Sequence, residues 1–112
     1  HLHEMMGDNL SCVIDAHAVP VLPGAWEAAD ACLYTAAGQR NRNHTGPFVR
    51  FENVPFPMEE ILFDPQTSGG LLLAAVPQDA AALEQELRAA GLPAAIVGEI
   101  LEKQTTEITV NY

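Results

Sequence analysis

The sequence predicts an α/β domain in which helices pack on a single mixed β-sheet. Apolar runs of strand length alternate with segments whose apolar residues recur at helical spacing. Glycine or proline stands at most of the boundaries between them. The 112 residues fit one domain, and 48% of them are apolar, which is enough for one core.

The N-terminal third predicts a short helix, a strand and a second helix. Residues 1–7 read as the tail of a helix that stops at Gly7. Residues 10–17 are rich in β-branched and apolar side chains and predict a strand. Residues 25–34 predict a helix with Trp26 as a core anchor. Its apolar face comprises Trp26, Ala29 and Leu33.

The middle of the chain is less regular. Residues 35–53 contain glycine and proline but little periodicity, so we expect a long loop, which in a compact domain is often functional. Residues 57–63 predict a short helix with acidic residues in its first turn. Asp64 ends this helix, because a residue before proline avoids the α region.

The last third predicts strand, helix, strand and strand. The continuous apolar run 70–76 indicates a fully buried central strand. Residues 78–90 form an amphipathic pattern closed by Gly91. Residues 94–100 and 105–110 predict two further strands. If 70–76 and 94–100 are parallel, their connection is a right-handed crossover.

Charge and composition exclude several classes of partner. With 15 acidic and 5 basic residues the formal charge is −10, which argues against nucleic acid and against anionic membrane surfaces. No apolar run of about 18 residues and no signal-peptide pattern is present. The chain begins inside a helix-like segment without an initiator methionine, so we expect a piece of a longer protein.

Cysteine and histidine spacing indicates no metal site. Cys12 and Cys32 lie in apolar runs and match no metal-binding pattern, so we expect buried free thiols and a reducing, cytoplasmic location. His1 and His3 would face different ways on a helix.

One polar turn precedes the apolar run 70–76. Two readings are open: a structural turn, or a small anion-binding concavity of hydroxyl groups and glycine amides. A strand rather than a helix is expected to follow, so the segment is not a P-loop. Its candidate residues are Asp64, Gln66, Thr67, Ser68, Gly69 and Gly70.

A second candidate is a local cluster of arginines. Arg40, Arg42 and Arg50 supply three of the five basic residues, and Asn41 lies among them. Arginine suits phosphate oxygens, so Arg40 and Asn41 are candidates to face a phosphate or an ATP tail. The alternative is a solvated loop in which arginine aids solubility.

Several segments resemble the selenide, water dikinase family. The run FDPQTSGGLLLAAVP, residues 63–77, is similar to a characteristic motif of that family's C-terminal domain. Supporting similarities occur in order at residues 1–5, 14–25, 38–41 and 94–99. In the family's loop two glycines usually precede the Arg-Asn pair, where Ala37 replaces one here.

The resemblance implies an aminoimidazole ribonucleotide synthetase-like C-terminal α/β domain that follows an N-terminal ATP-binding domain. The family makes selenophosphate from selenide, ATP and water with magnesium, releasing AMP and phosphate. Its reactive cysteine or selenocysteine, its lysine and its metal-binding aspartates lie N-terminal to the residues present here. We therefore expect no catalytic or metal-binding residue in this chain, no ATPase activity and no tight ATP binding by it alone.

The resemblance also implies partners. We expect the chain to contact its own N-terminal ATP-binding domain and the intact enzyme to be a homodimer. We further expect the turn 64–70 and the Arg40–Asn41 region to converge on one rim that faces the N-terminal domain. Two alternatives remain: the equivalent domain of a thiamine monophosphate kinase or hydrogenase-maturation protein, and a non-catalytic ligand-binding module.

Overall fold

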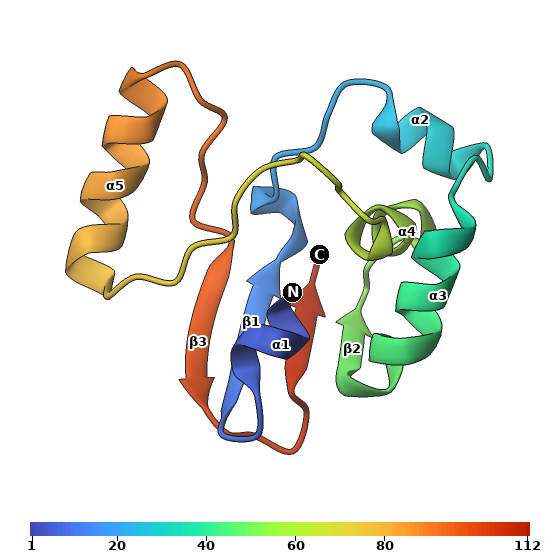
Figure 1. The fold of residues 1–112 in the computed structure, drawn as a ribbon, viewed down its shortest axis with the longest axis horizontal. Coiled ribbons are helices and arrows are strands. Elements are labelled where there is room, and N and C mark those ends of the chain that lie inside the picture. Colours follow the sequence, from blue (N-terminus) through green and yellow to red (C-terminus); the bar gives the residue numbers. More distant parts are fainter.

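A computed structural model describes residues 1–112 and has one four-stranded mixed sheet at its centre (Figure 1). The strand order is β2-β4-β1-β3, with β4 parallel to both β1 and β2 and with β3 antiparallel to β1. The strands are β1 (Leu10–Asp15), β2 (Val49–Glu52), β3 (Gly98–Glu102) and β4 (Ile108–Asn111). The predicted α/β class with a single mixed sheet is confirmed.

The core lies on one face of this sheet. Cys12 and Ile14 of β1 are in register with Ile108 and Val110 of β4, so the four buried side chains share a face. Helices α1 (Leu2–Met6) and α4 (Phe56–Phe63) pack against it through Met6 and Met58, each 2% exposed. The predicted helices at 1–7 and 57–63 are thus confirmed to within two residues at each end.

Strand β1 is shorter than predicted. The Asp15 carboxylate accepts a hydrogen bond from the backbone N–H of His17 at 2.9 Å. This local bond starts the 3-10 turn Ala16–Ala18 and ends the strand at Asp15.

Helix α2 (Ala25–Asp30) is also shorter than the predicted 25–34. Trp26 packs against the core and Ala29 is buried, as predicted. Leu33 lies beyond the helix and is 74% exposed, so its placement on the core face was wrong. Cys32 adopts the left-handed backbone conformation with φ 59°, which is incompatible with continuing the helix.

Residues 35–53 have mostly regular secondary structure, contrary to the expected loop. They form α3 (Ala36–Thr45), the 3-10 turn Gly46–Phe48 and strand β2. The sequence did not predict helix α3, because this helix is polar on nearly all sides and has no apolar stripe. It is held instead by side-chain hydrogen bonds and ion pairs to α4 and the residues that follow α4.

The apolar run 70–76 is not a strand, and this prediction was wrong. Residues 70–76 are exposed, Leu71 to 87% and Leu73 to 56%, and belong to no ladder. An apolar run favours burial but does not select a partner strand. Both sides of β1 are occupied, by β3 and by β4. The predicted crossover therefore does not form.

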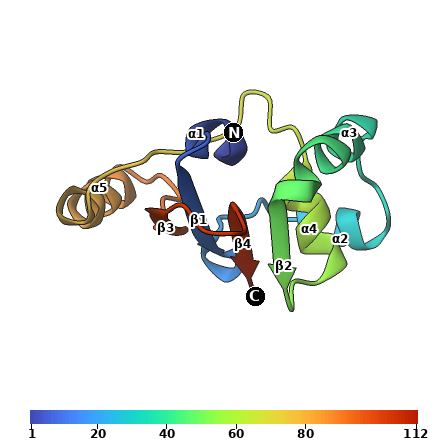
Figure 2. The same ribbon diagram turned by 90° about the horizontal axis from the view of Figure 1, so that it is seen from below.

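The helix predicted at 78–90 is confirmed as α5 (Pro77–Ala89). It buries no residue, and Figure 2 shows it set apart beside β3 while α2, α3 and α4 gather beyond β2. The last two strands begin three to four residues later than predicted, at Gly98 and Ile108.

Both cysteines are free, as expected, but only Cys12 is buried. Cys32 is exposed, so its predicted burial was wrong, because α2 ends before its apolar repeat reaches that residue. None of the helices has the length and hydropathy needed to cross a bilayer.

Candidate anion-facing site

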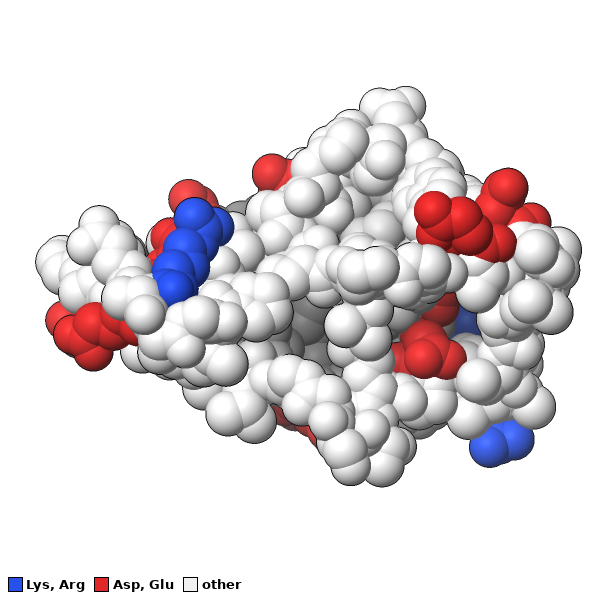
Figure 3. All heavy atoms as spheres, turned by 90° about the horizontal axis from the view of Figure 1, so that it is seen from above, with Lys and Arg blue, Asp and Glu red and all other residues white.

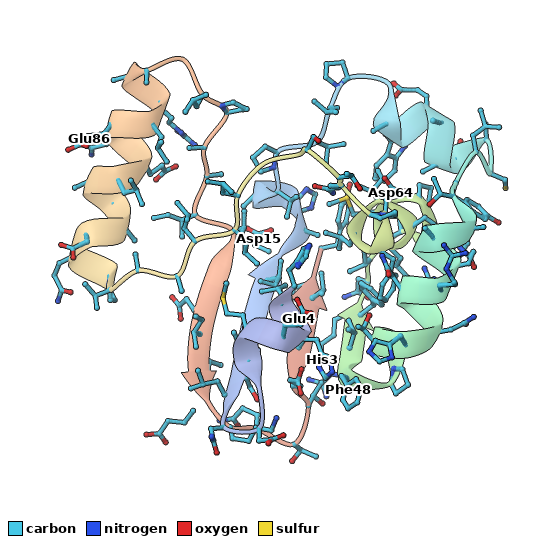
Figure 4. All side chains as sticks on the ribbon, viewed as in Figure 1. His3, Glu4, Asp15, Phe48, Asp64 and Glu86 are labelled. Carbon is cyan, nitrogen blue, oxygen red and sulfur yellow. The ribbon has the colours of Figure 1, made fainter.

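The turn 64–70 starts where α4 ends. Asp64 has extended backbone angles before Pro65, which stops the helix. Backbone bonds close the turn, from the Thr67 N–H to the Pro65 carbonyl at 3.0 Å and from the Gly69 N–H to the Gln66 carbonyl at 2.9 Å. In Figure 4 Asp64 lies at the end of α4 next to α3.

The far side of the turn is tightly bent and exposed. Ser68 has φ 61°, in the left-handed region that is uncommon for residues other than glycine. A Cβ atom at Gly69 would lie 2.9 Å from the Gln66 carbonyl oxygen, so this position requires glycine. Residues 66–70 are all exposed, and the Thr67 and Ser68 hydroxyl groups are available to a ligand.

Helix α3 contacts the start of this turn. The Thr35 hydroxyl caps the helix by accepting from the Gly38 N–H at 2.9 Å, and it donates to Asp64 Oδ1 at 3.1 Å. The Asn41 amide donates to the Phe63 carbonyl at 2.9 Å. The structure therefore joins α3 to the end of α4 and the start of the turn through two bonds, Asn41 to Phe63 and Thr35 to Asp64.

The arginine cluster does not act as one group. Arg42 lies between α3 and α4, with Nη1 2.9 Å from Glu59 Oε2 and Nη2 2.7 Å from Glu60 Oε1. The second contact does not have the geometry of a hydrogen bond, so it is an ion pair. The guanidinium also lies 4.8 Å from the ring centroid of Phe63. Arg42 is therefore structural.

Arg40 is the one basic side chain without an ion pair. Arg50 pairs with Glu52 at 2.9 Å, and the remaining basic residues, Arg88 and Lys103, also have carboxylate partners. Arg40 is exposed on α3, the helix that carries Asn41. Figure 3 looks down on the end of the molecule that the turn crosses and shows basic side chains that are few and well separated.

A cavity that was not predicted lies elsewhere. Its volume is about 520 Å³, and its charged lining residues are Asp8, Arg50, Lys103 and Glu107. Two bases and two acids cancel, so the lining does not select an anion. None of the residues in the turn 64–70 lines it.

Next to this cavity His3 binds the buried Glu107. His3 Nδ1 lies 2.6 Å from Glu107 Oε1, and its ring stacks on Phe48 at a centroid distance of 4.3 Å (Figure 4). Burial would raise the pKa of Glu107, but hydrogen bonds and charges from His3 and Lys103 outweigh it and lower that pKa below the ordinary value.

The surroundings of Cys12 do not activate its thiol. Burial, and then the negative charge of Glu107, raise the pKa of the Cys12 thiol, which makes it a poor nucleophile. No three His, Cys, Asp or Glu side chains gather closely enough to hold a metal ion. At α3 and the turn, the exposed polar side chains include Arg40, Thr67 and Ser68.

Comparison with known proteins identifies the class of domain. Residues 1–111 match the family described as AIR synthase related protein, C-terminal domain. The chain therefore belongs to this family, in agreement with its α/β fold.

The more specific similarity is to selenide, water dikinases. A protein of that name from Agathobacter rectalis is 53% identical over 112 residues, covering 99% of this chain. Others, from Desulfitobacterium hafniense and Treponema denticola, are 44% and 38% identical over 96% and 99% of the chain. The chain spans about a third of the length of these relatives.

Proposed function

We propose that this chain is the C-terminal domain of a selenide, water dikinase, which forms selenophosphate from selenide, ATP and water and releases AMP and phosphate. The supporting observation is 53% identity to a protein of that name across 99% of the chain. The reactive and metal-binding residues belong to the N-terminal domain, which is the partner of this one, and the intact enzyme is a cytoplasmic homodimer. Two free thiols fit a reducing compartment.

Within that enzyme we propose that Arg40 and the exposed residues 66–70 of the turn face the phosphate groups of ATP or its products. Arg40 supports this role because its charge is not neutralised by a carboxylate, unlike that of every other basic residue here. The hydroxyl groups of Thr67 and Ser68 and the amide of Gly70 supply further donors, whereas the Gly69 N–H is already bonded to the Gln66 carbonyl.

ATP and magnesium belong to the intact enzyme in this proposal. This chain does not fit a magnesium site by itself, because no three suitable side chains gather. Asp64 already accepts from Thr35. When bound, the metal neutralises charge on the phosphates, and the role of this chain is to add donors on one rim of the nucleotide site.

The test is selenophosphate formation by the intact enzyme with Arg40→Ala. Loss of one charge-assisted contact of about 1.5–3 kcal/mol should lower activity roughly ten- to hundredfold without changing folding. Thr67→Ala or Ser68→Ala should cost less, near the ~1 kcal/mol of a neutral hydrogen bond. Arg88→Ala is the matched control, because this arginine pairs with Glu84 on α5 and should leave activity unchanged. Full activity of Arg40→Ala would refute the proposed role.

The alternative functions make different predictions. If the domain belongs to a sister ATP-dependent enzyme, the intact protein should turn over ATP without selenide. If it is a non-catalytic module, no AMP should form at all. Selenide-dependent AMP release by the intact protein, together with none from the isolated 112-residue chain, is the result that we expect.

A further inference from the structure

We infer that Thr35, Asn41 and Asp64 are positioning residues that hold the anion-facing turn on helix α3 and do not themselves contact substrate. This inference rests on the proposed function of the turn. It changes the role of Asn41 and Asp64, which the sequence had suggested as phosphate-facing groups.

The Thr35 hydroxyl joins two elements. It accepts from the Gly38 N–H at 2.9 Å and so orders the first turn of α3. The same hydroxyl group donates a hydrogen bond to Asp64 Oδ1 at 3.1 Å. One oxygen therefore fixes the start of α3 and the start of the turn relative to each other, across 29 positions of sequence.

Asn41 forms the second connection. Its amide donates to the Phe63 carbonyl at 2.9 Å, which satisfies one of the carbonyl groups left free at the end of α4. The next residue on a helix points about 100° away, so Arg40 faces a different direction from Asn41. Arg40 is thus carried by a helix whose rotation is set by Asn41 and by the ion pairs of Arg42.

Beyond Pro65 the turn has little other support. Its backbone bonds are the two short-range ones within residues 65–69, and residues 66–70 are exposed. The two hydrogen bonds at its start are therefore the side-chain hydrogen bonds that tie the beginning of the turn to α3, which carries Arg40. Losing them should loosen the turn while the core, which none of these residues joins, stays intact.

The experiment uses the intact enzyme with Thr35→Val, which keeps the shape of threonine but removes its hydroxyl group. We expect kcat to fall about tenfold while the KM for ATP stays within about twofold, because displacement of a positioned group mainly affects the reacting complex. Amide hydrogen exchange of Thr67 and Gly69, whose N–H groups are hydrogen-bonded within the turn, should accelerate about tenfold. Thr35→Ser should restore both values, and Thr45→Val, which removes a hydroxyl group at the other end of α3, should leave both unchanged.

The Asp64→Asn variant distinguishes a positioning role of Asp64 from direct contact of its charge with substrate or metal. The amide oxygen of asparagine still accepts from Thr35, so a positioning role predicts activity within about threefold of the wild type. A loss of more than about a hundredfold in this variant would mean that Asp64 acts through its charge on substrate or metal, and would overturn the inference.

Two further outcomes distinguish this inference from the proposed function. If Thr35→Val leaves the exchange of the Thr67 and Gly69 amides unchanged, the positioning role fails, whatever Arg40→Ala does. A different result is faster exchange in Thr35→Val while both Thr35→Val and Arg40→Ala keep full activity. In that case Thr35 holds the turn as inferred, but the turn does not serve the reaction, and its proposed function fails. If Thr35→Val does not fold, Asn41→Leu, which breaks only the bond to Phe63, is judged by the same two measurements.

Discussion

Replacing Gly98 by alanine should destabilise the domain, because β3 passes too close to β1 for a side chain at this position. Gly98 pairs with Ile14 in the antiparallel ladder. A Cβ atom here would overlap the Val13 carbonyl oxygen and would lie 2.9 Å from Ile14 Cδ1. The nearer neighbour is backbone of a central strand, so a rotamer change cannot relieve the overlap.

The magnitude follows from two opposing effects. Overpacking costs about 1–3 kcal/mol, and contact with backbone places this change near the upper end. Alanine also reduces the freedom of the unfolded chain, which returns about 0.4–1 kcal/mol. The net loss should be about 2 kcal/mol, which lowers the urea midpoint by roughly 1 M for a domain of this size.

The assay is urea unfolding of the 112-residue chain followed by circular dichroism. Gly46→Ala is the matched control, because a Cβ atom there would have no neighbour within 4 Å and the φ of −51° suits any residue. The control should match or slightly exceed the wild-type midpoint. If Gly98→Ala also unfolds at the wild-type midpoint, β3 does not approach β1 closely enough to exclude a side chain.

Two ionic contacts give further predictions. The pKa of Glu107 is lowered in the fold by His3 and Lys103, so its contribution to stability is present above its unfolded pKa and is lost as pH falls through its folded pKa. Glu107→Gln should therefore reduce the fall of the urea midpoint at acid pH. If the midpoint of the variant falls as steeply as that of the wild type, Glu107 is not the source of this pH dependence. Arg42→Ala leaves Glu60, whose side chain is 2% exposed, without its cation and should cost about 3–5 kcal/mol. Arg42→Lys should recover only part of this in thermal unfolding, because lysine lacks the planar fork, and full recovery would show that charge alone matters.

Patterns in the sequence predicted the features that depend on neighbouring residues. The repeat of Ala80, Leu83 and Leu87 predicted α5, and the β-branched run beginning at Leu10 predicted β1. The DPQTSGG segment also indicated the family. These signals are local, because helical periodicity, strand propensity and turn chemistry act over a few residues.

The tertiary structure alone shows which distant groups meet. It left residues 70–76 outside the sheet, although their composition predicted a central strand. It separated Arg40 from Arg42, which sequence alone treated as one cluster, by placing Glu59 and Glu60 of α4 against the latter. It also placed the Thr35 hydroxyl on Asp64. Strand partners, ion pairs and hydrogen bonds of this kind join residues far apart in the chain, and their formation depends on how elements pack, which no local pattern of residues encodes.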